Sequence, residues 1–490
     1  MNVYSNQIAF WMNGRQVEID FSREGTWRPT TTVLQYLRSL PDHKGTKEGC
    51  AEGDCGACTV VVAEPDSDGK LQYRAIDSCL VFLPMIHGKQ LITVEHLGTS
   101  ENLHPVQQAM VDCDGSQCGY CTPGFIMSLF ALYKSGAAPD RPEVMDALTG
   151  NLCRCTGYRS IVQAAERSCT GACHDHFSEN EPHVCQKLQA LQQEKADVSI
   201  TDQSGNTYLR PSSLAEAVAY RAAHPSALIV CGGTDVGLMV TKKKLNLPQV
   251  LDLSGVRELQ DIAETVDGLR LGATLSLERV KAASKGRFPA LYDMLAVFGS
   301  RQIREQATLG GNLANASPIG DTPPVLMALD ASVEVTGASG SRVMKVSEFI
   351  TGYRTTALRP DELISAVIIP PTPAGRVVKS YKISKRKDLD ISTASGGFWL
   401  ELDGVGAVKD IGLVYGGMAA MTKRAVQAEE FLLGKPWTRE NVEAAMDLID
   451  AEFTPISDAR SGKEGRRLMA RNLLLKFWSD TIQMPHVQLH

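Results

Sequence analysis

The apolar residues of the first hundred positions form short runs of the kind found in strands. Strand-like runs occur at residues 8–12, 16–21 and 59–64, and a helical stretch lies at residues 31–40. Asn13 and Gly14, between the first two runs, are typical of a two-residue hairpin turn. The pattern predicts a domain of strands and one helix at residues 1–95.

The pattern then changes to apolar residues at helical spacing. Helices are predicted at residues 104–113, 123–134, 142–148 and 160–168. Thr122 and Pro123 are typical of a helix start, where threonine lies near the N-cap and proline lies in the first turn. These observations predict a helical domain at residues 96–168.

Beyond residue 168 the periodicity is lost and Gln, Glu and Lys become frequent, which favours a linker at residues 169–198. Mixed α/β patterns follow, and we divide them into two domains at residues 199–375 and 376–490. In the first domain we expect a helix at 213–223 and a buried strand at 227–231. In the second domain, strand-like runs at 391–402 and 411–418 precede helices at 423–433, 439–453 and 465–478.

The composition is that of a globular protein with several domains. A chain of 490 residues is too long for one core, and 43% hydrophobic and 22% charged residues are ordinary proportions. The net charge of −6 gives no general reason to bind nucleic acid or an anionic membrane. We find no apolar run of eighteen residues and no secretory signal, so we expect a cytoplasmic protein. Its thirteen cysteines then favour reduced, metal-binding thiols over disulfides.

Four cysteines in the first domain have the ligand spacing of a plant-type [2Fe–2S] cluster. Cys50, Cys55 and Cys58 follow the pattern C-x4-C-x2-C, and Cys79 lies about twenty residues further on. Glycines among them allow the chain to curl and to direct backbone N–H groups at an anionic cluster. Buried free cysteines are the alternative, but three in nine residues, interleaved with glycine, favour a cluster.

A second set of four cysteines precedes two of the predicted helices. Cys118 and Cys121 lie before the helix at 123–134, and Cys153 and Cys155 lie before the helix at 160–168. Helix N-termini stabilise an anionic cluster through their dipoles and unpaired N–H groups. Zinc with four thiolates is a real alternative, and the spacing alone leaves both open. The C-x-C pair and the neighbouring cluster domain favour iron.

Two glycine-rich runs, at residues 232–237 and 308–321, are candidates for binding phosphate. Each could cradle a pyrophosphate through backbone N–H groups, or could only form a tight turn. The first run matches neither the dinucleotide-binding nor the P-loop motif. Two such runs in one domain favour a large phosphate-bearing cofactor.

Three stretches resemble motifs of the molybdenum hydroxylases, a family that includes xanthine dehydrogenase, aldehyde oxidase and carbon monoxide dehydrogenase. They are GCAEGDCGAC at residues 49–58, QCGYCTPG at 117–124 and NLCRCTGY at 151–158. The resemblance implies a multidomain α+β fold: a β-grasp [2Fe–2S] ferredoxin domain, a four-helix [2Fe–2S] domain, an α+β FAD-binding domain and an α+β flavoprotein C-terminal domain. It also implies that Gln117 contacts the pterin of a molybdopterin and that the ferredoxin-type cluster lies nearer the flavin.

The same resemblance implies a set of FAD contacts. A loop around the FAD pyrophosphate would consist of Val230, Cys231, Gly232, Gly233, Thr234, Asp235, Val236 and Gly237. Further contacts would come from Phe298, Thr308, Gly311, Asn312, Asn315, Ser317, Asp321, Ile364 and Lys382. On an apolar helix Phe298 would otherwise belong to the core. Tyr353 and Asp390 are candidates for the nicotinamide side, with a surface aromatic and a solvated turn as the alternatives.

The order of the modules implies an electron-transfer role. Because the molybdopterin-binding portion of the family does not fit in 490 residues, the resemblance implies a separate molybdopterin-binding subunit and an assembly with two copies of each chain. In the purine-oxidising branch of the family, electrons from hypoxanthine or xanthine would pass through the second cluster, the first cluster and FAD to NAD. Another substrate, such as an aldehyde or an N-heterocycle, and a non-catalytic Fe–S module are the alternatives.

The predicted linker also holds cysteines and histidines, at residues 169–185. Such a cluster could bind zinc, but its spacing fits no standard site. Spare thiols in a linker are the simpler interpretation.

Overall fold

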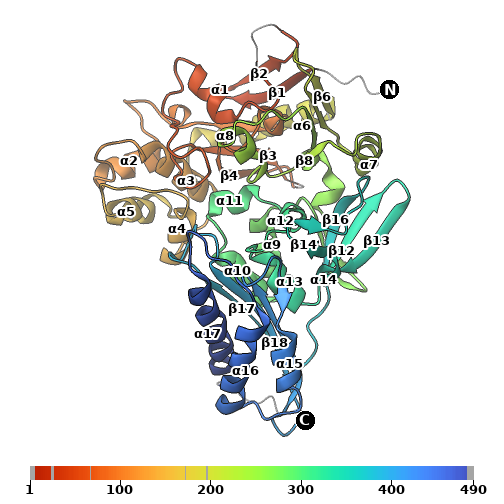
Figure 1. Cartoon of the computed structure of the whole chain (residues 1–490). Coiled ribbons are helices and arrows are strands. Elements are labelled where there is room, and N and C mark those ends of the chain that lie inside the picture. Colours follow the sequence, from red (N-terminus) through yellow and green to blue (C-terminus); the bar gives the residue numbers. More distant parts are fainter. Residues whose placement is uncertain (1–5, 24–26, 67, 172, 195–196, 483–490) are drawn as a thin grey trace. The chain divides into compact units, whose positions relative to one another are not determined.

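The computed structural model describes residues 6–23, 27–66, 68–171, 173–194 and 197–482, so the outer ends of the first and last predicted domains lie outside the described residues (Figure 1). The chain forms two compact units. The first contains Met1–Arg257 and Ser300–Ala307, and the second contains Glu258–Gly299 and Thr308–His490. None of the described helices is both long enough and apolar enough to cross a membrane.

The first unit begins with a five-stranded sheet in the order β2-β1-β5-β3-β4. Its elements are β1 (Gln7–Met12), β2 (Arg15–Asp20), α1 (Val33–Ser39), β3 (Thr59–Pro65), β4 (Leu71–Asp77) and β5 (Gln90–Ile92). Strands β1 and β5 are parallel, and the other neighbours are antiparallel. Asn13 and Gly14 both have positive φ, as a type I′ turn requires, which confirms the predicted hairpin.

Strand β3 is buried on both faces, which explains its unbroken run of valines. Val60 and Val62 belong to one core together with Phe10, on the side of α1. Val61 points to the opposite face and belongs to the core of the helical domain together with Phe125. A strand that is covered on both faces is apolar at successive positions rather than at alternate ones. The sheet and the helical domain therefore share a continuous core.

The four predicted helices are present (Figure 1). They are α2 (Pro105–Asp112), α3 (Thr122–Lys134), α4 (Arg141–Ala147) and α5 (Arg159–Ser168). The N-cap of α3 is Cys121, so Thr122 lies next to the cap and Pro123 lies in the first turn, as predicted. Each half of the second cysteine set precedes a helix, as predicted.

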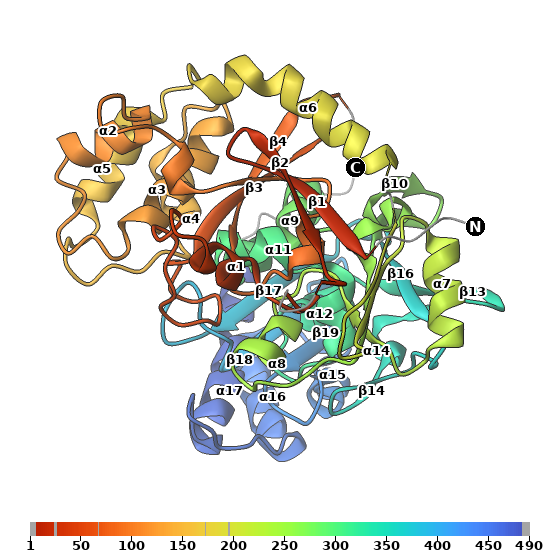
Figure 2. The same ribbon diagram turned by 90° about the horizontal axis from the view of Figure 1, so that it is seen from above.

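The segment predicted as a linker without periodicity contains a helix, α6 (His176–Glu194), so the sequence interpretation is wrong there. Figure 2 shows α6 running from the four-helix domain across the strands of the ferredoxin sheet. Its buried side chains include Val184, Leu188 and Leu191, which have helical spacing. This narrow apolar stripe is surrounded by polar residues, and Pro182 lies within the helix, so the stripe was difficult to recognise.

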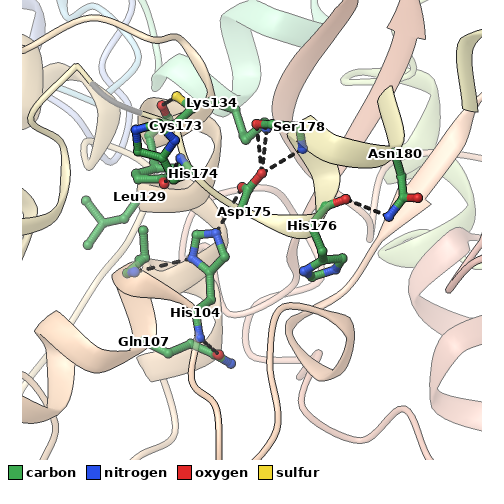
Figure 3. A network of polar contacts seen from close by, with 12 residues as sticks. His104, Gln107, Leu129, Lys134, Cys173, His174, Asp175, His176, Ser178 and Asn180 are labelled. Atoms are coloured by element: carbon green, nitrogen blue, oxygen red, sulfur yellow. Dashed lines mark hydrogen bonds and ion pairs between the residues drawn. The ribbon is translucent and has the colours of Figure 1, made fainter. Parts of the chain in front are cut away.

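The start of α6 is fixed by a buried network of charged groups (Figure 3). Asp175 accepts hydrogen bonds from His104 Nε2 at 3.1 Å and from Lys134 Nζ at 3.0 Å. The backbone N–H of Ser178 also donates to Asp175, at 2.7 Å. Burial favours the neutral acid, but these donors outweigh burial and hold the pKa of Asp175 well below its usual range. The network connects α6 to the N-cap of α2 and to the last turn of α3.

A second sheet, in the order β6-β7-β9-β8, completes the first unit together with three helices. The elements are β6 (Val198–Thr201), β7 (Thr207–Arg210), α7 (Leu214–Ala223), β8 (Leu228–Val230), α8 (Val236–Thr241), β9 (Gln249–Asp252) and α11 (Arg301–Gln306). Strands β7, β9 and β8 are parallel, and β6 is antiparallel to β7. The helix predicted at 213–223 and the strand predicted at 227–231 are confirmed by α7 and β8.

The second unit contains two main sheets, in the orders β10-β11-β16-β12-β13 and β17-β18-β19-β20, and the small hairpin β14-β15. Its strands are β10 (Ile262–Thr265), β11 (Gly268–Gly272), β12 (Ser332–Gly337), β13 (Gly340–Lys345), β14 (Ile350–Gly352), β15 (Thr355–Thr356), β16 (Leu363–Ile369), β17 (Val377–Ile383), β18 (Ala394–Leu402), β19 (Val408–Gly416) and β20 (Lys423–Arg424). Its helices are α9 (Leu277–Ser284), α10 (Pro289–Ala296), α12 (Leu309–Asn315), α13 (Thr322–Ala328), α14 (Val346–Phe349), α15 (Val426–Leu432), α16 (Arg439–Glu452) and α17 (Lys463–Ile482). The strands and helices predicted after residue 390 are confirmed by β18, β19, α15, α16 and α17.

Candidate functional site

The first set of cysteines gathers at one end of the ferredoxin sheet. Cys58 directly precedes β3 and Cys79 follows β4, and the antiparallel pairing of these strands brings the two thiols into contact. Cys50 and Cys55 contact each other in the loop before β3. The structure therefore pairs the predicted ligands two by two, Cys58 with Cys79 at the strand ends and Cys50 with Cys55 in the loop.

Backbone N–H groups point at the sulfurs of this set, as predicted for a loop that holds an anionic cluster. The N–H groups of Glu52 and Asp54 both donate to Cys50 Sγ, at 3.4 Å. The Cys55 thiol and these N–H groups lower the pKa of Cys50 to about 5. Gly53 has a φ of +81°, a conformation that glycine adopts without strain and that lets the loop curl around the sulfur.

The second set of cysteines gathers at the N-terminal ends of α3 and α5. Cys118 contacts Cys155, and Cys121 contacts Cys153. The N–H of Cys155 donates to Cys153 Sγ at 3.4 Å. The N–H of Tyr120 and the Cys155 thiol lower the pKa of Cys118. These arrangements repeat the features of the first set.

The two sets differ in their exposure to solvent. Cys58 and Cys79 are 2% and 1% exposed, whereas Cys118 and Cys155 are exposed on the surface. Gln117, the predicted pterin contact, is exposed beside Cys118. Cys50 and Cys55 are half-buried and Cys153 is buried, so the first set is the more buried of the two and the second set is the one with exposed thiols.

The loops that carry the two sets contact each other through their backbones. The N–H of Leu152, next to Cys153, donates to the carbonyl of Cys55 at 3.1 Å. At the surface, the hydroxyl of Tyr120 donates to the carbonyl of Glu48 at 2.5 Å. A Cβ atom on Gly124 would lie 2.1 Å from the carbonyl oxygen of Gly56, so only glycine fits there. These contacts between the two loops hold the two cysteine sites next to each other.

The thiols of the α6 segment do not gather. Cys173 donates to the carbonyl of Tyr133 at 2.9 Å, and Cys185 donates to the carbonyl of Gly69 at 3.0 Å. Across the part of the chain that the structure describes, no group of three or more His, Cys, Asp or Glu side chains is arranged to hold a single metal ion.

The first glycine-rich run lies in the first unit, against the loop of the first cysteine set. It connects β8, which ends at Val230, to α8, which starts at Val236. A Cβ atom on Gly233, where φ is +77°, would lie 2.5 Å from the carbonyl of Leu80, the residue after Cys79. Of the predicted loop residues, Gly237 packs against Leu80 too. The structure thus places the predicted pyrophosphate loop beside a predicted cluster ligand.

The second glycine-rich run lies in the second unit and is partly helical. Thr308 caps α12, and its hydroxyl accepts the N–H of Gly311 at 3.2 Å. The side-chain carbonyl of Asn312 accepts a hydrogen bond from Thr322 at 2.6 Å. Ser317 accepts the N–H of Ile319 within the loop that follows α12. The backbone N–H groups of Gly310, Gly311 and Asn312 all donate within the protein, to Ala273 and Thr308.

Several predicted flavin residues of the second unit come together around Asp321. Its carboxylate is buried and accepts from Lys382 Nζ at 2.8 Å and from Ser392 Oγ at 2.5 Å. Lys382 also donates to the carbonyl of Val297, next to Phe298. Phe298 lies two residues beyond the end of α10, so the prediction that placed it on a helix is wrong. Both carboxylate oxygens of Asp321 are thus occupied by protein donors.

The remaining predicted residues lie on β16 and in two exposed segments. Ile364 is buried in β16. Tyr353 is 63% exposed at the turn between β14 and β15, and its neighbour Arg354 donates to Asn315 Oδ1 at 2.6 Å. The carboxylate of Asp390 accepts two hydrogen bonds from the Arg386 guanidinium, which lowers the pKa of Asp390.

Sequence reasoning missed the buried amides that stand between these loops. Asn151 is 3% exposed, although it lies in a recognised motif. Gln302 and Gln306 are buried on α11, whose sequence RQIREQ has the composition of a solvent-facing helix. Their burial could not be predicted from neighbouring residues, because the groups that these amides contact are distant in sequence.

Family comparisons agree with this arrangement of sites. Four family models match the chain: a 2Fe-2S iron-sulfur cluster binding domain at residues 13–83, a [2Fe-2S] binding domain at 93–166, the FAD binding domain in molybdopterin dehydrogenase at 201–372, and the CO dehydrogenase flavoprotein C-terminal domain at 379–481. The chain belongs to the molybdenum hydroxylase family. This molybdenum hydroxylase chain carries two [2Fe–2S]-binding domains and an FAD-binding domain, so the predicted fold class and resident cofactors are confirmed.

Individual relatives of this molybdenum hydroxylase chain have several specificities. Xanthine dehydrogenase of Emericella nidulans is 32% identical over 98% of this chain and 39% of its own length. Aldehyde oxidase 2 of Cavia porcellus is 30% identical over 98% of this chain and 40% of its own length. The chain thus spans about two fifths of the length of these curated relatives.

Solved structures of the family cover about half of the chain. Carbon monoxide dehydrogenase from Hydrogenophaga pseudoflava is 27% identical, with a TM-score of 0.52 over 55% of this chain and 94% of that chain. Quinoline 2-oxidoreductase from Pseudomonas putida 86 is 25% identical, with a TM-score of 0.52 over 56% of this chain and 96% of that chain.

Proposed function

We propose that this chain is the electron-transfer subunit of a xanthine dehydrogenase and works with a molybdopterin-binding subunit that oxidises hypoxanthine or xanthine. Relatives named xanthine dehydrogenase, with 29–32% identity over nearly the whole chain, support this choice of substrate. NAD is the proposed final acceptor, and two copies of each subunit form the proposed assembly. When bound, the two clusters carry single electrons and FAD converts them to the two-electron reduction of NAD.

The difference in exposure between the two cysteine sets is the observation that carries the proposal. Electrons from a partner protein must enter at a site that the partner can approach, and Cys118 and Cys155 are exposed. The first set, in which Cys58 and Cys79 are buried, lies instead against the predicted pyrophosphate loop through Leu80. This order gives the electrons one direction, from the surface through the interior toward the flavin.

The residues of the chain have holding and shielding roles in this proposal. The first cysteine set holds one cluster and shields one side of it through the buried Cys58 and Cys79. Cys118, Cys121, Cys153 and Cys155 hold the other cluster, and Gln117 beside them faces the proposed pterin. In the second unit, Asp321 fixes the ammonium group of Lys382 for the flavin, and the exposed Tyr353 is proposed on the nicotinamide side.

Replacement of Cys118 tests the proposed direction of electron flow. In the purified complex, Cys118→Ala should abolish reduction of FAD by xanthine but leave reduction of FAD by NADH unchanged. Cys113→Ala, which alters a half-buried cysteine outside both sets, is the matched control and should retain both reactions. Undiminished turnover from xanthine to NAD in Cys118→Ala would refute the proposal.

A second candidate is a molybdenum hydroxylase with another substrate, because aldehyde oxidase and quinoline oxidoreductase are also among the relatives. Assays of the purified complex with purines, aldehydes and quinolines separate these candidates. A non-catalytic Fe–S module would instead purify without flavin, so an absorbance spectrum with a flavin band excludes it.

A further inference from the structure

A buried side chain stands between the two cysteine loops and contacts both sides. Asn151 Nδ2 donates to the carbonyl of Gly56 and to Thr59 Oγ1, both at 3.1 Å. Gly56 follows Cys55 in the first loop, while Asn151 itself lies two residues before Cys153 in the second. The amide therefore spans the short distance from one proposed cluster ligand to another.

The side-chain carbonyl of Asn151 is fixed in turn by two donors. Ser128 Oγ on α3 donates to Asn151 Oδ1 at 2.6 Å, and Gln302 Nε2 on α11 donates at 3.0 Å. Gln302 is 0% exposed and also donates to the carbonyl of Ala147. With two bonds donated and two accepted, the amide of Asn151 has one possible orientation. An amide held in this way positions its neighbours firmly.

Helix α11, which carries Gln302, belongs to the first unit although it comes from a distant part of the sequence. At its other end, Gln306 Oε1 accepts the N–H of Asp77, two residues before Cys79, at 2.9 Å. A Cβ atom on Gly232 would lie 1.9 Å from the backbone carbonyl oxygen of Gln306, so the predicted flavin loop also packs against α11. One short helix thus contacts the second cysteine loop, the first cysteine loop and the glycine-rich loop.

We propose that Asn151 and Gln302 are positioning residues for electron transfer between the two clusters, and that they hold the two cysteine loops at the separation that this transfer needs. The inference rests on the proposed electron relay. It adds that the intercluster step depends on a side-chain bridge and on α11, not only on the cysteines. Outer-shell contacts of this kind tune a metal centre without ligating it.

Two substitutions of the full chain, purified with its cofactors, test the bridge. Asn151→Asp keeps the size of the side chain but replaces the Nδ2 donor, so two acceptors face each other at Gly56. Gln302→Met keeps a similar length and removes the donor to Asn151, together with the contacts of Gln302 with Ser128 and the carbonyl of Ala147. Asn206→Asp is the matched control, because Asn206 is also buried in the first unit and its Nδ2 also donates to an oxygen, that of Asp202.

The main measurement is electron paramagnetic resonance of the dithionite-reduced protein, with iron and flavin analysis alongside. Two reduced clusters held close together split each other's signals, and we expect this splitting in the wild type and in Asn206→Asp. Asn151→Asp and Gln302→Met should keep both cluster signals and lose the splitting. In the complex with the molybdopterin subunit, reduction of FAD by xanthine should slow about ten- to a hundredfold in these variants.

The outcomes distinguish this inference from the proposed function. A wild-type chain that lacks either cluster signal contradicts the electron relay itself. Wild-type splitting and wild-type rates in Asn151→Asp or Gln302→Met overturn the bridge and leave the relay intact. Loss of iron in both variants, with iron retained in Asn206→Asp, also overturns the bridge, because it indicates a purely structural role.

Discussion

Replacement of Asp175 by asparagine should loosen α6 from the four-helix domain. The change keeps the shape of the side chain and removes the anion that His104 and Lys134 share. Both donors are nearly inaccessible, since the side chains of His104 and Lys134 are 1% and 3% exposed. Removing one partner of a buried ion pair costs about 3–5 kcal/mol, because the other charge is left buried.

The expected loss lies at the lower end of that range. Lys134 keeps its hydrogen bond to Ser178 at 2.7 Å and its position 4.9 Å from the centre of the Tyr73 ring, so its charge is not left without contacts. We therefore expect a loss of about 3 kcal/mol in the free energy of unfolding. For a unit of this size, the unfolding midpoint falls by roughly 6–12 °C.

Scanning calorimetry of the full chain measures the midpoint, and hydrogen exchange of the α6 backbone amides locates the change. Glu179→Gln is the control, because it makes the same acid-to-amide change at an exposed position on α6 and should alter stability by less than about 0.5 kcal/mol. The reasoning fails if Asp175→Asn unfolds within about 2 °C of wild type and its α6 amides exchange at the wild-type rate.

Three further outcomes follow from the contacts described. The pKa of Asp175 is lowered in the folded state, so its stabilising effect is complete above the ordinary aspartate pKa of about 4 and is lost as pH falls further. The difference in unfolding midpoint between wild type and Asp175→Asn should therefore shrink below about pH 4. A difference that grows there contradicts a stabilising role of the Asp175 carboxylate. Gly233→Ala should reduce FAD content, because its Cβ atom meets the carbonyl of Leu80. Gly205→Ala, at a position with the same φ of +77° and open space around it, should retain FAD. Equal FAD content in the two variants would show that the close contact between Gly233 and Leu80 is unimportant for FAD binding. Lys382→Met and Asp321→Asn should each destabilise the second unit, and the double variant should lose less than the sum by at least about 1 kcal/mol, whereas additive losses in calorimetry would exclude a coupled pair.

The elements that the sequence predicted well are those whose determinants are local. The type I′ turn needs only Asn13 and Gly14, and the cysteine loops are recognisable by the spacing of their cysteines and by their glycines. Strand β3 was also predicted from local sequence, because three successive valines are typical of a buried strand. In each case the signal that predicts the element lies within a short stretch of chain, although the residues that cover both faces of β3, such as Phe125, are distant in sequence.

The elements that the sequence failed to predict depend on partners far along the chain. Helix α6 is stabilised by the contacts of Asp175 with α2 and α3, which neighbouring residues do not encode. The buried face of α11 is polar because Gln302 satisfies groups about 150 positions away. A glutamine that is buried for this reason cannot be distinguished, from its own neighbourhood, from one that faces solvent.

The return of the chain into the first unit has a consequence for biosynthesis. Ser300–Ala307 belong to that unit, yet about 150 residues separate them from Cys155, the last of the predicted cluster ligands. At a translation rate of about 5–20 residues per second, this interval lasts about 8–30 s. During that time both cysteine loops exist on the nascent chain and α11 does not, so neither loop can be closed by it. The order of the sequence therefore leaves both cysteine loops without the contacts of Gln302 and Gln306 for this period of synthesis.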